Sequence, residues 1–494
     1  MLKELFTKIA SGEEIKTSLA EFKQELGKTE DISRIPSSVT EGYTVFCRLL
    51  QDDDPKVRKN AALILGMLHC QNALDDLYQG YISDETLYNK AAYLKAIGSI
   101  NFDRYKDELL KKRDELISIS PSAETKKHLM EELHELNMLL MPCFEKHNFV
   151  GNELVNECVL LTNRNFKQVT MKELGKIPHK EFTAGVMVKT KQIDYVLHNV
   201  RTYSELLFVP ETIKTVSAEA SIAAQELTDS DIISYISCRL SNPDSPIRFR
   251  IEDRGKDSKL SAIYARTLGS ELELLSHGRF INSTDNYEIE LRFIDNSDGR
   301  KVVLIQFCML KDTRFSYRKH SLAVSLRPYL AALFIQLSSG YLKDNAAVLD
   351  PFCGCGTMLT EREKFSPARL YYGIDLFGDA VTAARDNIKA AGFASKCELI
   401  KRDFFDFKHE YKFDEIITDM PFSTNAKTPA DIENIYKRFF KAVDGFCEKD
   451  AHLFIYSRNR DYLRKYSLAN GFKILEEFEI SKIEKAYFFI LAKN

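Results

Sequence analysis

The sequence predicts a multidomain α/β protein with a helical N-terminal part, an α+β middle part and an open, mainly parallel sheet at the C-terminal end. Three observations predict this fold class. Residues 1–145 carry apolar residues at helical spacing with few glycines. Short strand-like runs begin at Val155, and from Ala346 apolar runs alternate with helical segments. Such alternation is typical of parallel strands joined by crossover helices.

Composition limits the classes of protein that the chain can belong to. Its 494 residues, 44% of them hydrophobic, are enough for several domains with cores of their own. The formal net charge of −3 means that any surface for nucleic acid must be local. Ten cysteines without CxxC spacing argue against a metal site and favour reduced thiols. Because no signal peptide or long apolar run is recognisable, we expect a cytoplasmic protein without a membrane span.

Residues 1–148 are expected to form a helical domain. The segment Asp54–Gly66 resembles a HEAT repeat, and in a weaker copy further along Lys90 takes the place of Arg58. Stacked helix pairs bury a shared face and leave a concave surface. Two imperfect copies leave an ordinary helical bundle nearly as good an interpretation. We expect this domain to bind a protein partner or support the others.

The middle of the chain is expected to form two α+β domains, residues 149–210 and 211–310. Short apolar runs indicate strands in the first domain, which Pro210 closes. In the second, residues 247–252 and 287–294 alternate between apolar and polar side chains as half-buried strands do.

Basic residues are concentrated before the C-terminal domain. Between Ser245 and Leu330 there are 15 Lys and Arg against 11 Asp and Glu, and Lys311–Arg327 is the densest part. Guanidinium groups and aromatic faces suit phosphates and unstacked bases, so we predict RNA contact here, with a solvated linker as the alternative. The predicted RNA-binding residues are Arg314, Tyr317, Arg318, Lys319 and Arg327.

The C-terminal domain, residues 311–494, is organised around Ala346–Glu361. An apolar run ends at Asp350, a turn with Gly354 and Gly356 follows, and a helix begins at Thr357. This junction brings backbone N–H groups to a point that an adenosine-bearing ligand can approach. On these residues alone, a tight turn without a ligand is an equal interpretation.

Acidic residues follow the next three predicted strands. Asp375, Asp403 and Asp419 each stand at or just after a strand end, and Asp375 lies about 20 residues beyond the glycine loop, as a ribose-binding carboxylate requires. In an open parallel sheet, ligands bind at the carboxyl ends of the strands. Each acid alone fits a helix cap. Together with Asp350 they predict a ligand site.

The end of the chain predicts a reversed strand. A helix is expected over Ile432–Cys447, and two strands over residues 474–479 and 487–491. The turn between these strands is too short for a crossover helix, so they should pair antiparallel. A dinucleotide dehydrogenase would continue in parallel, which weighs against NAD.

Two motifs carry a resemblance to a known family. The loop DPFCGCGTMLTE resembles motif I of class I S-adenosylmethionine-dependent methyltransferases, in the branch whose loop reads Asp-Pro-Phe-Cys-Gly-Ser-Gly-Thr. The sequence DMPF at Asp419 resembles the Asp/Asn-Pro-Pro-Tyr/Phe motif of amino-group methyltransferases. The resemblance covers about Val155 to Asn494. Cys355 replaces the usual Ser and Ser423 stands where many relatives have Gly, which leaves the shape of the substrate pocket open.

The resemblance implies a fold and a reaction. That branch joins a Rossmann-like domain, with a seven-stranded sheet and an antiparallel last strand, to a THUMP domain, and methylates N2 of guanosine in RNA, mostly tRNA. It implies a ferredoxin-like domain at residues 149–210, a THUMP domain at 211–310 and the catalytic domain at 311–494.

The resemblance also implies S-adenosylmethionine as the cofactor and assigns parts of its pocket. Asp350 and the glycine loop would hold the methionine end, Asp375 the ribose, and Asp403 with Phe404 the adenine, while Ser325–Pro328 would lie against the pocket. The expected cofactor-binding residues are Asp350, Pro351, Cys353, Gly354, Gly356, Thr357, Asp375, Asp403 and Phe404.

The DMPF tip suits methylation of an exocyclic amine. The lone pair of such an amine is delocalised, so acceptors must hold its N–H bonds and orient it. Asp419 and a carbonyl of the Met420–Pro421 turn can accept these bonds, Pro421 stiffens the turn, and Phe422 can stack on the base. No metal is required. The predicted catalytic residues are therefore Asp419, Pro421 and Phe422.

Three functions remain open from the sequence. An RNA guanine-N2 methyltransferase acting on tRNA is favoured. A methyltransferase for amino groups of rRNA, DNA or protein comes second, because the tip does not specify the polymer. A non-catalytic RNA-binding factor with the same fold is the third.

Overall fold

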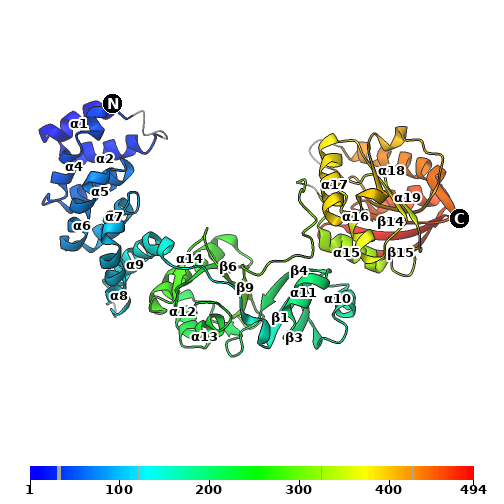
Figure 1. The fold of residues 1–494 in the computed structure, drawn as a ribbon, viewed down its shortest axis with the longest axis horizontal. Coiled ribbons are helices and arrows are strands. Elements are labelled where there is room, and N and C mark those ends of the chain that lie inside the picture. The colour runs from blue at the N-terminus through cyan, green and yellow to red at the C-terminus, as the bar shows by residue number, and fades with distance from the viewer. Residues whose placement is uncertain (30–34, 120–121, 324, 424–427, 494) are drawn as a thin grey trace. The chain divides into compact units, whose positions relative to one another are not determined.

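The computed structural model describes residues 1–29, 35–119, 122–323, 325–423 and 428–493, and the chain can be followed in Figure 1. The chain divides into two compact units, one of Met1–Gly151 with Val209–Leu310 and one of Asn152–Phe208 with Lys311–Asn494. The predicted boundaries at residues 148, 210 and 310 lie close to the points where the chain passes from one unit to the other. The four domain names themselves remain predictions.

In the first unit, successive helices pack side by side. Helix α5 contacts α7, and α7 contacts α9. Asp54 caps the first turn of α5, where its carboxylate accepts a hydrogen bond from the Lys56 backbone at 2.7 Å. The described helices over residues 1–145 are α1 Leu2–Ser11, α2 Ile15–Leu26, α3 Ser37–Thr40, α4 Thr44–Leu49, α5 Pro55–Met67, α6 Leu74–Ser83, α7 Leu87–Ile97, α8 Lys106–Ile117 and α9 Lys126–Leu140.

The two HEAT-like segments form helices, but their matching positions differ in their contacts. Arg58 forms an ion pair with Asp84 at 2.8 Å. Lys90 instead donates to the backbone carbonyls of Tyr81 and Ile82. The helical character of this part is confirmed, while its assignment to HEAT repeats stays a prediction.

The rest of the first unit contains a sheet in the order β9-β8-β6-β7, with the short β5 on β9. The strands predicted at residues 247–252 and 287–294 are confirmed, although the second begins at Ile289. The elements are β5 Thr215–Val216, α12 Ala220–Thr228, α13 Ile232–Ser237, β6 Ile247–Asp253, α14 Ser258–Leu275, β7 Phe280–Asn282, β8 Ile289–Asp295 and β9 Lys301–Phe307.

The second unit begins with a small antiparallel sheet in the order β2-β3-β1-β4. Its element order is β-α-β-β-α-β, an order that ferredoxin-like folds have, so we call it the ferredoxin-like part; its assignment to a ferredoxin-like domain stays a prediction. The elements are β1 Asn156–Thr162, α10 Lys167–Leu174, β2 His179–Phe182, β3 Gly185–Thr190, α11 Ile193–Asn199 and β4 Tyr203–Phe208.

The larger part of the second unit is an open sheet with helices on both faces. Its described strands follow the order β12-β11-β10-β13-β14-β16-β15, and β16 is antiparallel to both of its neighbours, as predicted. Buried side chains of α18 and α19 pack on one face, and those of α15, α16 and α17 on the other. The elements are α15 Pro328–Leu337, β10 Ala347–Asp350, α16 Thr357–Phe365, β11 Leu370–Asp375, α17 Gly378–Ala391, β12 Cys397–Lys401, β13 Phe413–Asp419, α18 Pro429–Val443, β14 Cys447–Ser457, α19 Arg460–Ala469, β15 Phe472–Ser481 and β16 Ala486–Lys493.

One predicted boundary in this sheet is wrong. The helix expected to reach Cys447 ends at Val443, and Cys447 is the first residue of β14. A short 3-10 turn over Asp444–Phe446 separates the two elements. Of the two apolar residues that were expected to continue the helix, Phe446 lies in this turn and Cys447 is the buried first residue of the strand.

A buried ion pair joins the ferredoxin-like part of the second unit to the larger sheet. The Arg201 guanidinium donates two hydrogen bonds to Glu361 on α16, at 2.9 and 2.8 Å. The Tyr317 hydroxyl donates to the same carboxylate at 2.6 Å. The Glu361 side chain is 1% exposed, so these three groups satisfy one another away from water.

Glu361→Gln should therefore destabilise the second unit. The amide leaves the Arg201 charge without its counter-charge, and breaking a buried pair typically costs about 3–5 kcal/mol. Denaturant unfolding measures the loss, with the exposed Glu448→Gln as the control. Equal stability of the two variants would show that the ion pair contributes nothing.

Candidate active site

The carboxyl ends of the parallel strands surround a cavity of about 670 Å³. Every residue predicted to bind the cofactor or act in catalysis lines it, with the exception of Gly356. The predicted residues in the lining are Asp350, Pro351, Cys353, Gly354, Thr357, Asp375, Asp403, Phe404, Asp419, Pro421 and Phe422. The topology thus brings together four strand ends that are far apart in the sequence.

The glycine loop needs its two glycines for different reasons. Gly354 and Gly356 have φ angles of 51° and 75°, in the left-handed region that other residues rarely adopt. A Cβ at Gly356 would approach the Ile388 side chain to 3.2 Å, so this glycine allows α16 to pack on α17. A Cβ at Gly354 would meet nothing within 4 Å, because the loop faces open space there.

Asp375 holds the glycine loop against β11. Its Oδ2 accepts a hydrogen bond from the Gly354 backbone and its Oδ1 one from the Phe377 backbone, both at 2.9 Å. Each carboxylate oxygen can accept a second hydrogen bond. The half-buried Asp375 can therefore fix the loop and bind hydroxyl groups of a ligand at once.

Asp350 is almost fully buried at the end of β10. Its Oδ1 accepts hydrogen bonds from the Thr418 hydroxyl at 2.8 Å and the Phe352 backbone at 3.1 Å. Burial, with a smaller contribution from the charges of Asp419 and Asp375, raises the pKa of Asp350 to about 8. Near neutral pH this carboxyl is largely protonated, and a cationic ligand group would favour its ionisation.

Asp419 stands at the tip of β13, where the Met420 backbone donates to the Tyr456 carbonyl at 2.9 Å. Burial raises the pKa of Asp419 to about 7, against the opposing effect of Arg458. In the described part of the chain, no group donates a hydrogen bond to this carboxylate. Its acceptor oxygens remain available to a ligand in the cavity.

Arg458 is a candidate that the sequence analysis missed. Its guanidinium carbon lies 4.2 Å from the centre of the Phe422 ring, and it forms an ion pair with Glu484 at 3.6 Å. Arg458 directly follows the end of β14. The acids were predicted because they follow strand ends, and the same criterion predicts Arg458.

Part of the cavity lining is aromatic and includes Phe377, Phe404 and Phe405. Asp403 caps a short 3-10 turn by accepting from the Phe405 backbone at 3.0 Å. Phe404 is 2% exposed and packs against other rings, while the Arg438 guanidinium lies 3.8 Å over Phe405. Phe377 is 62% exposed although it is apolar and lines the cavity. This part of the lining suits a flat, uncharged ring.

Several lining residues were not among the predictions. Ser325 and Leu326 belong to the predicted Ser325–Pro328 segment, whose other two residues are not part of the lining. Leu376 and Arg402 directly neighbour predicted acids. Further unpredicted lining residues are Leu322, Phe352, Cys355, Met358, Phe377, Ala380, Phe405, Met420, Ile435 and Arg438. Those on α18 had no signal in the sequence.

The prediction that Arg314 and Tyr317 contact RNA is wrong. Arg314 is 4% exposed, forms an ion pair with Asp312 at 2.6 Å, and lies 3.5 Å over the Tyr203 ring. Tyr317 is 3% exposed and donates to Glu361. Both side chains pack the ferredoxin-like part against the larger sheet of the second unit.

The other three residues of the predicted RNA-binding set have accessible side chains. Lys319 and Arg327 are exposed, and Arg318 is half-buried. None of them lines the cavity. Their contact with RNA stays a prediction.

The described residues contain no cluster of three or more His, Cys, Asp or Glu side chains that could hold a metal ion. None of the described helices is long and apolar enough to cross a membrane.

The raised pKa of Asp350 predicts a dependence of stability on pH. Between about pH 4 and about pH 8 the native state keeps a proton that the unfolded chain releases, so stability should fall as the pH rises. Asp350→Asn cannot ionise and should lose this part of the slope. Denaturant unfolding across this range measures it, with the exposed Asp406→Asn as the control. A slope unchanged from the wild type would mean that Asp350 is ionised in the native state.

Comparisons with known proteins agree with this geometry. Residues 316–482 match the family model described as "RMKL-like, methyltransferase domain". The mouse U6 snRNA (guanine-N(2))-methyltransferase THUMPD2 is 31% identical over 200 residues, which are 40% of this chain and 37% of that protein. The tRNA (guanine(10)-N2)-dimethyltransferase of Methanothermobacter thermautotrophicus is 32% identical over 120 residues, 24% of this chain and 34% of that protein. The matched region thus spans less than two fifths of either relative.

Two solved structures match the fold of a large part of this chain. TrmN from Thermus thermophilus has a TM-score of 0.51 and 16% identity, with 69% of this chain and 100% of that chain covered. SMU.472, a putative methyltransferase complexed with SAH, has a TM-score of 0.51 and 15% identity, with 69% and 98% covered. Residues 316–482 are therefore similar to RMKL-like methyltransferase domains, and the second unit contains the class I methyltransferase fold.

Proposed function

We propose that the chain transfers a methyl group from S-adenosylmethionine to the exocyclic N2 of guanosine in RNA, with tRNA as the first substrate to test. The observation that carries the proposal is the cavity in which the uncommitted Asp419 carboxylate and Phe422 face the Asp350 and Asp375 loops. The names of the relatives, which act on U6 snRNA and tRNA, support guanine N2 as the target. Because these relatives are matched over less than two fifths of their length, the polymer is part of the proposal.

The residues of the cavity fit the cofactor. Its volume of about 670 Å³ suits a ligand of nucleoside size, and the space beyond Gly354 is open. Asp375 would accept from ribose hydroxyls, and Asp350 would pair with the ammonium group of the methionine end. The turn that begins at Asp403 would enclose the adenine. When bound, the cofactor supplies an electrophilic methyl group on a sulfonium.

Asp419 would orient the nucleophile. Its carboxylate accepts one N–H bond of the amine, and a carbonyl of the Met420–Pro421 turn accepts the other, so that the lone pair points toward the methyl group. As nitrogen gains the new bond it becomes cationic, and the charge of Asp419 stabilises it. Asp419 can then take the proton that nitrogen releases. Arg458 favours the ionised form of Asp419 that this role requires.

The remaining parts of the chain would bind the substrate. Lys319 and Arg327 are exposed just before the catalytic sheet and would contact phosphates. Residues 211–310 would form the THUMP domain that the relatives' name suggests. The described cysteines form no disulfide bond with one another, which is compatible with the predicted cytoplasmic location.

Asp375→Ala should weaken the binding of S-adenosylmethionine. Each lost hydrogen bond to a charged group costs roughly 1.5–3 kcal/mol, and the Gly354 backbone loses its partner as well. Isothermal calorimetry measures the affinity, and the exposed Asp379→Ala on α17 is the control. A folded Asp375→Ala protein with unchanged affinity would remove this carboxylate from the cofactor site.

Asp419→Asn should leave cofactor affinity nearly intact while methyl transfer falls by about two to four orders of magnitude, because the lost charge acts mainly in the transition state. The wild-type rate should rise with pH through about 7, as Asp419 ionises. Single-turnover assays with labelled cofactor measure both effects.

Arg458→Gln is the companion variant in the same assay. Without the guanidinium, the pKa of Asp419 should rise further and the pH profile should shift upward. Two results together would mean that the DMPF tip is structural: full activity of Asp419→Asn, and an Arg458→Gln pH profile that is the same as that of the wild type.

A further inference from the structure

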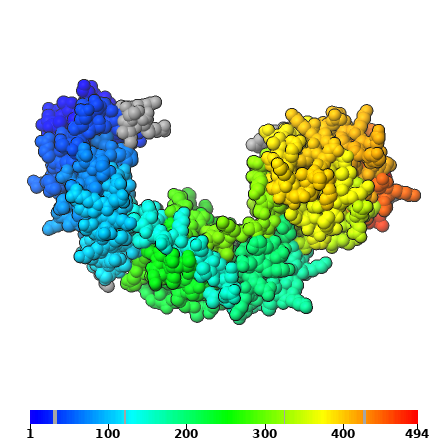
Figure 2. Space-filling model, viewed as in Figure 1, coloured from blue at the N-terminus to red at the C-terminus, as the bar shows by residue number. Residues whose placement is uncertain are grey.

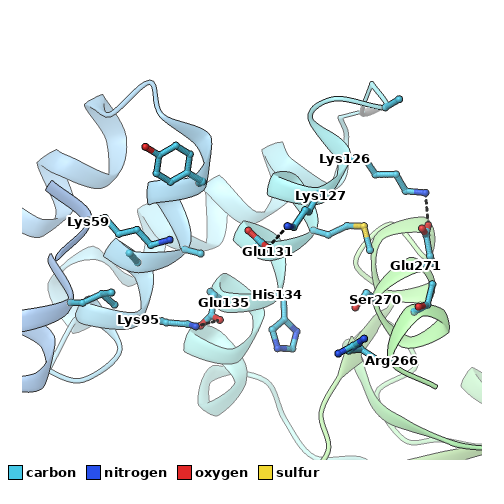
Figure 3. Close-up of a pocket in the computed structure, with 17 residues that line it drawn as sticks. Lys59, Lys95, Lys126, Lys127, Glu131, His134, Glu135, Arg266, Ser270 and Glu271 are labelled. Atoms are coloured by element: carbon cyan, nitrogen blue, oxygen red, sulfur yellow. Dashed lines mark ion pairs between the residues drawn. The ribbon is translucent and has the colours of Figure 1, made fainter. Parts of the chain in front are cut away.

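The first unit contains a groove of about 970 Å³ far from the methyltransferase domain in the sequence. Its walls come from α5, α7, α9 and α14, and Figure 3 shows their basic side chains. Helices α9 and α14 contact one another, as the cyan and green surfaces of Figure 2 show. All of its lining residues lie outside the region that matches the methyltransferase family. The groove therefore needs an explanation of its own.

The groove is positively charged in a chain whose net charge is −3. Three carboxylates in its lining, Glu131, Glu135 and Glu271, oppose a larger number of basic groups. The basic residues in the lining are Lys59, Lys95, Lys126, Lys127 and Arg266. Even with His134 neutral, the lining carries an excess of positive charge.

Three of these cations already have acidic partners. Lys126 pairs with Glu271 at 2.6 Å and Lys95 with Glu135 at 3.1 Å, while Lys127 lies 4.0 Å from Glu131. These pairs reduce the charge available to a ligand.

Two cations are not neutralised. Within the described parts of the chain, neither Lys59 nor Arg266 has a carboxylate at ion-pair distance. The Lys59 ammonium instead lies 5.5 Å from the centre of the Tyr88 ring. The two cations come from α5 and α14, on different walls of the groove (Figure 3).

A buried network fixes the walls. Glu273 on α14 binds His134 at 3.0 Å and Asn137 at 2.8 Å, both on α9. Arg113 on α8 donates to Asn137 at 2.6 Å and to the Gly278 carbonyl at 2.7 Å. Because α9 and α14 are held by these bonds, the groove is formed before any ligand enters, which lowers the entropic cost of binding.

We propose that this groove binds the phosphodiester backbone of the RNA substrate, away from the nucleotide that is methylated; this inference rests on the proposed function. A guanidinium and an ammonium on separate walls suit successive phosphates, and the half-exposed Tyr88 ring offers a face to a base. The cores of protein–protein interfaces are depleted of Lys and Glu, whereas surfaces for nucleic acid are rich in basic residues. The composition of the lining therefore favours a polyanion over an acidic protein.

The test compares two double variants of the full chain. Lys59→Gln with Arg266→Gln removes the two unpaired cations of the groove. Lys56→Gln with Lys259→Gln removes two exposed charges from the same two helices without touching the lining. Both variants lose the same net charge, so a general electrostatic effect would appear in both.

The affinity for a fluorescently labelled RNA hairpin with a single-stranded extension is measured at several salt concentrations. The groove variant should bind about tenfold more weakly, and its slope of log K against log salt should fall by about 1.5, since each lost phosphate contact removes the release of a counterion. The control variant should match the wild type. In turnover assays the groove variant should show a raised KM for RNA with kcat unchanged.

Equal affinity and salt slope in the groove variant would overturn the inference and leave the groove to an acidic protein partner. Photo-cross-linking provides a readout that does not need the variants: cross-linked peptides from α5, α9 or α14 support the inference, and cross-links confined to other segments overturn it. The proposed function fails separately, if the wild-type chain transfers no methyl group to guanosine. Binding of S-adenosylmethionine by calorimetry should be the same in all three proteins.

Discussion

The candidate active site depends on one constraint, which is that parallel strands end at the same edge of a sheet. Strands β10, β11 and β13 bring Asp350, Asp375 and Asp419 to one cavity, and Asp403 follows the end of β12. Four carboxylates at one edge would repel one another if all were charged and exposed. The fold gives each a different environment, and these environments separate their roles.

Asp350 keeps a proton because it is buried, while Asp375 is held by two backbone N–H groups. Burial also raises the pKa of Asp419, but no group in the described part of the chain donates a hydrogen bond to it, so its charge depends on the balance between burial and Arg458. An acceptor without a partner in the free protein is costly for stability but useful for catalysis, because its hydrogen-bonding capacity is kept for the substrate. At Asp419, the requirement of the proposed reaction for a free acceptor therefore opposes the stability of the fold.

Cationic and aromatic side chains are divided between packing and recognition. In the second unit, the side chains of Arg201, Arg314 and Tyr317 are buried or paired where the ferredoxin-like part packs against the larger sheet. They are therefore not available to a ligand. In the first unit, Lys59 and Arg266 line a preformed groove and have no acidic partner among the residues that the structure describes. Burial and pairing, rather than the number of basic residues in a segment, decide which cations can meet a polyanion.

Neighbouring residues were enough to predict most strands of the larger sheet, the glycine loop and the acids of the cavity, because apolar periodicity, glycine positions and strand ends follow from local sequence. The resemblance of two short motifs added the methyltransferase fold. Three further features could not be predicted in this way: Arg314 and Tyr317 are buried, Ile435 and Arg438 line the cavity with Arg458 beside Phe422, and four helices enclose a basic groove. These features arise from contacts between segments distant in the chain. A local sequence pattern does not show which side chains this packing will bury and which will stay exposed to solvent.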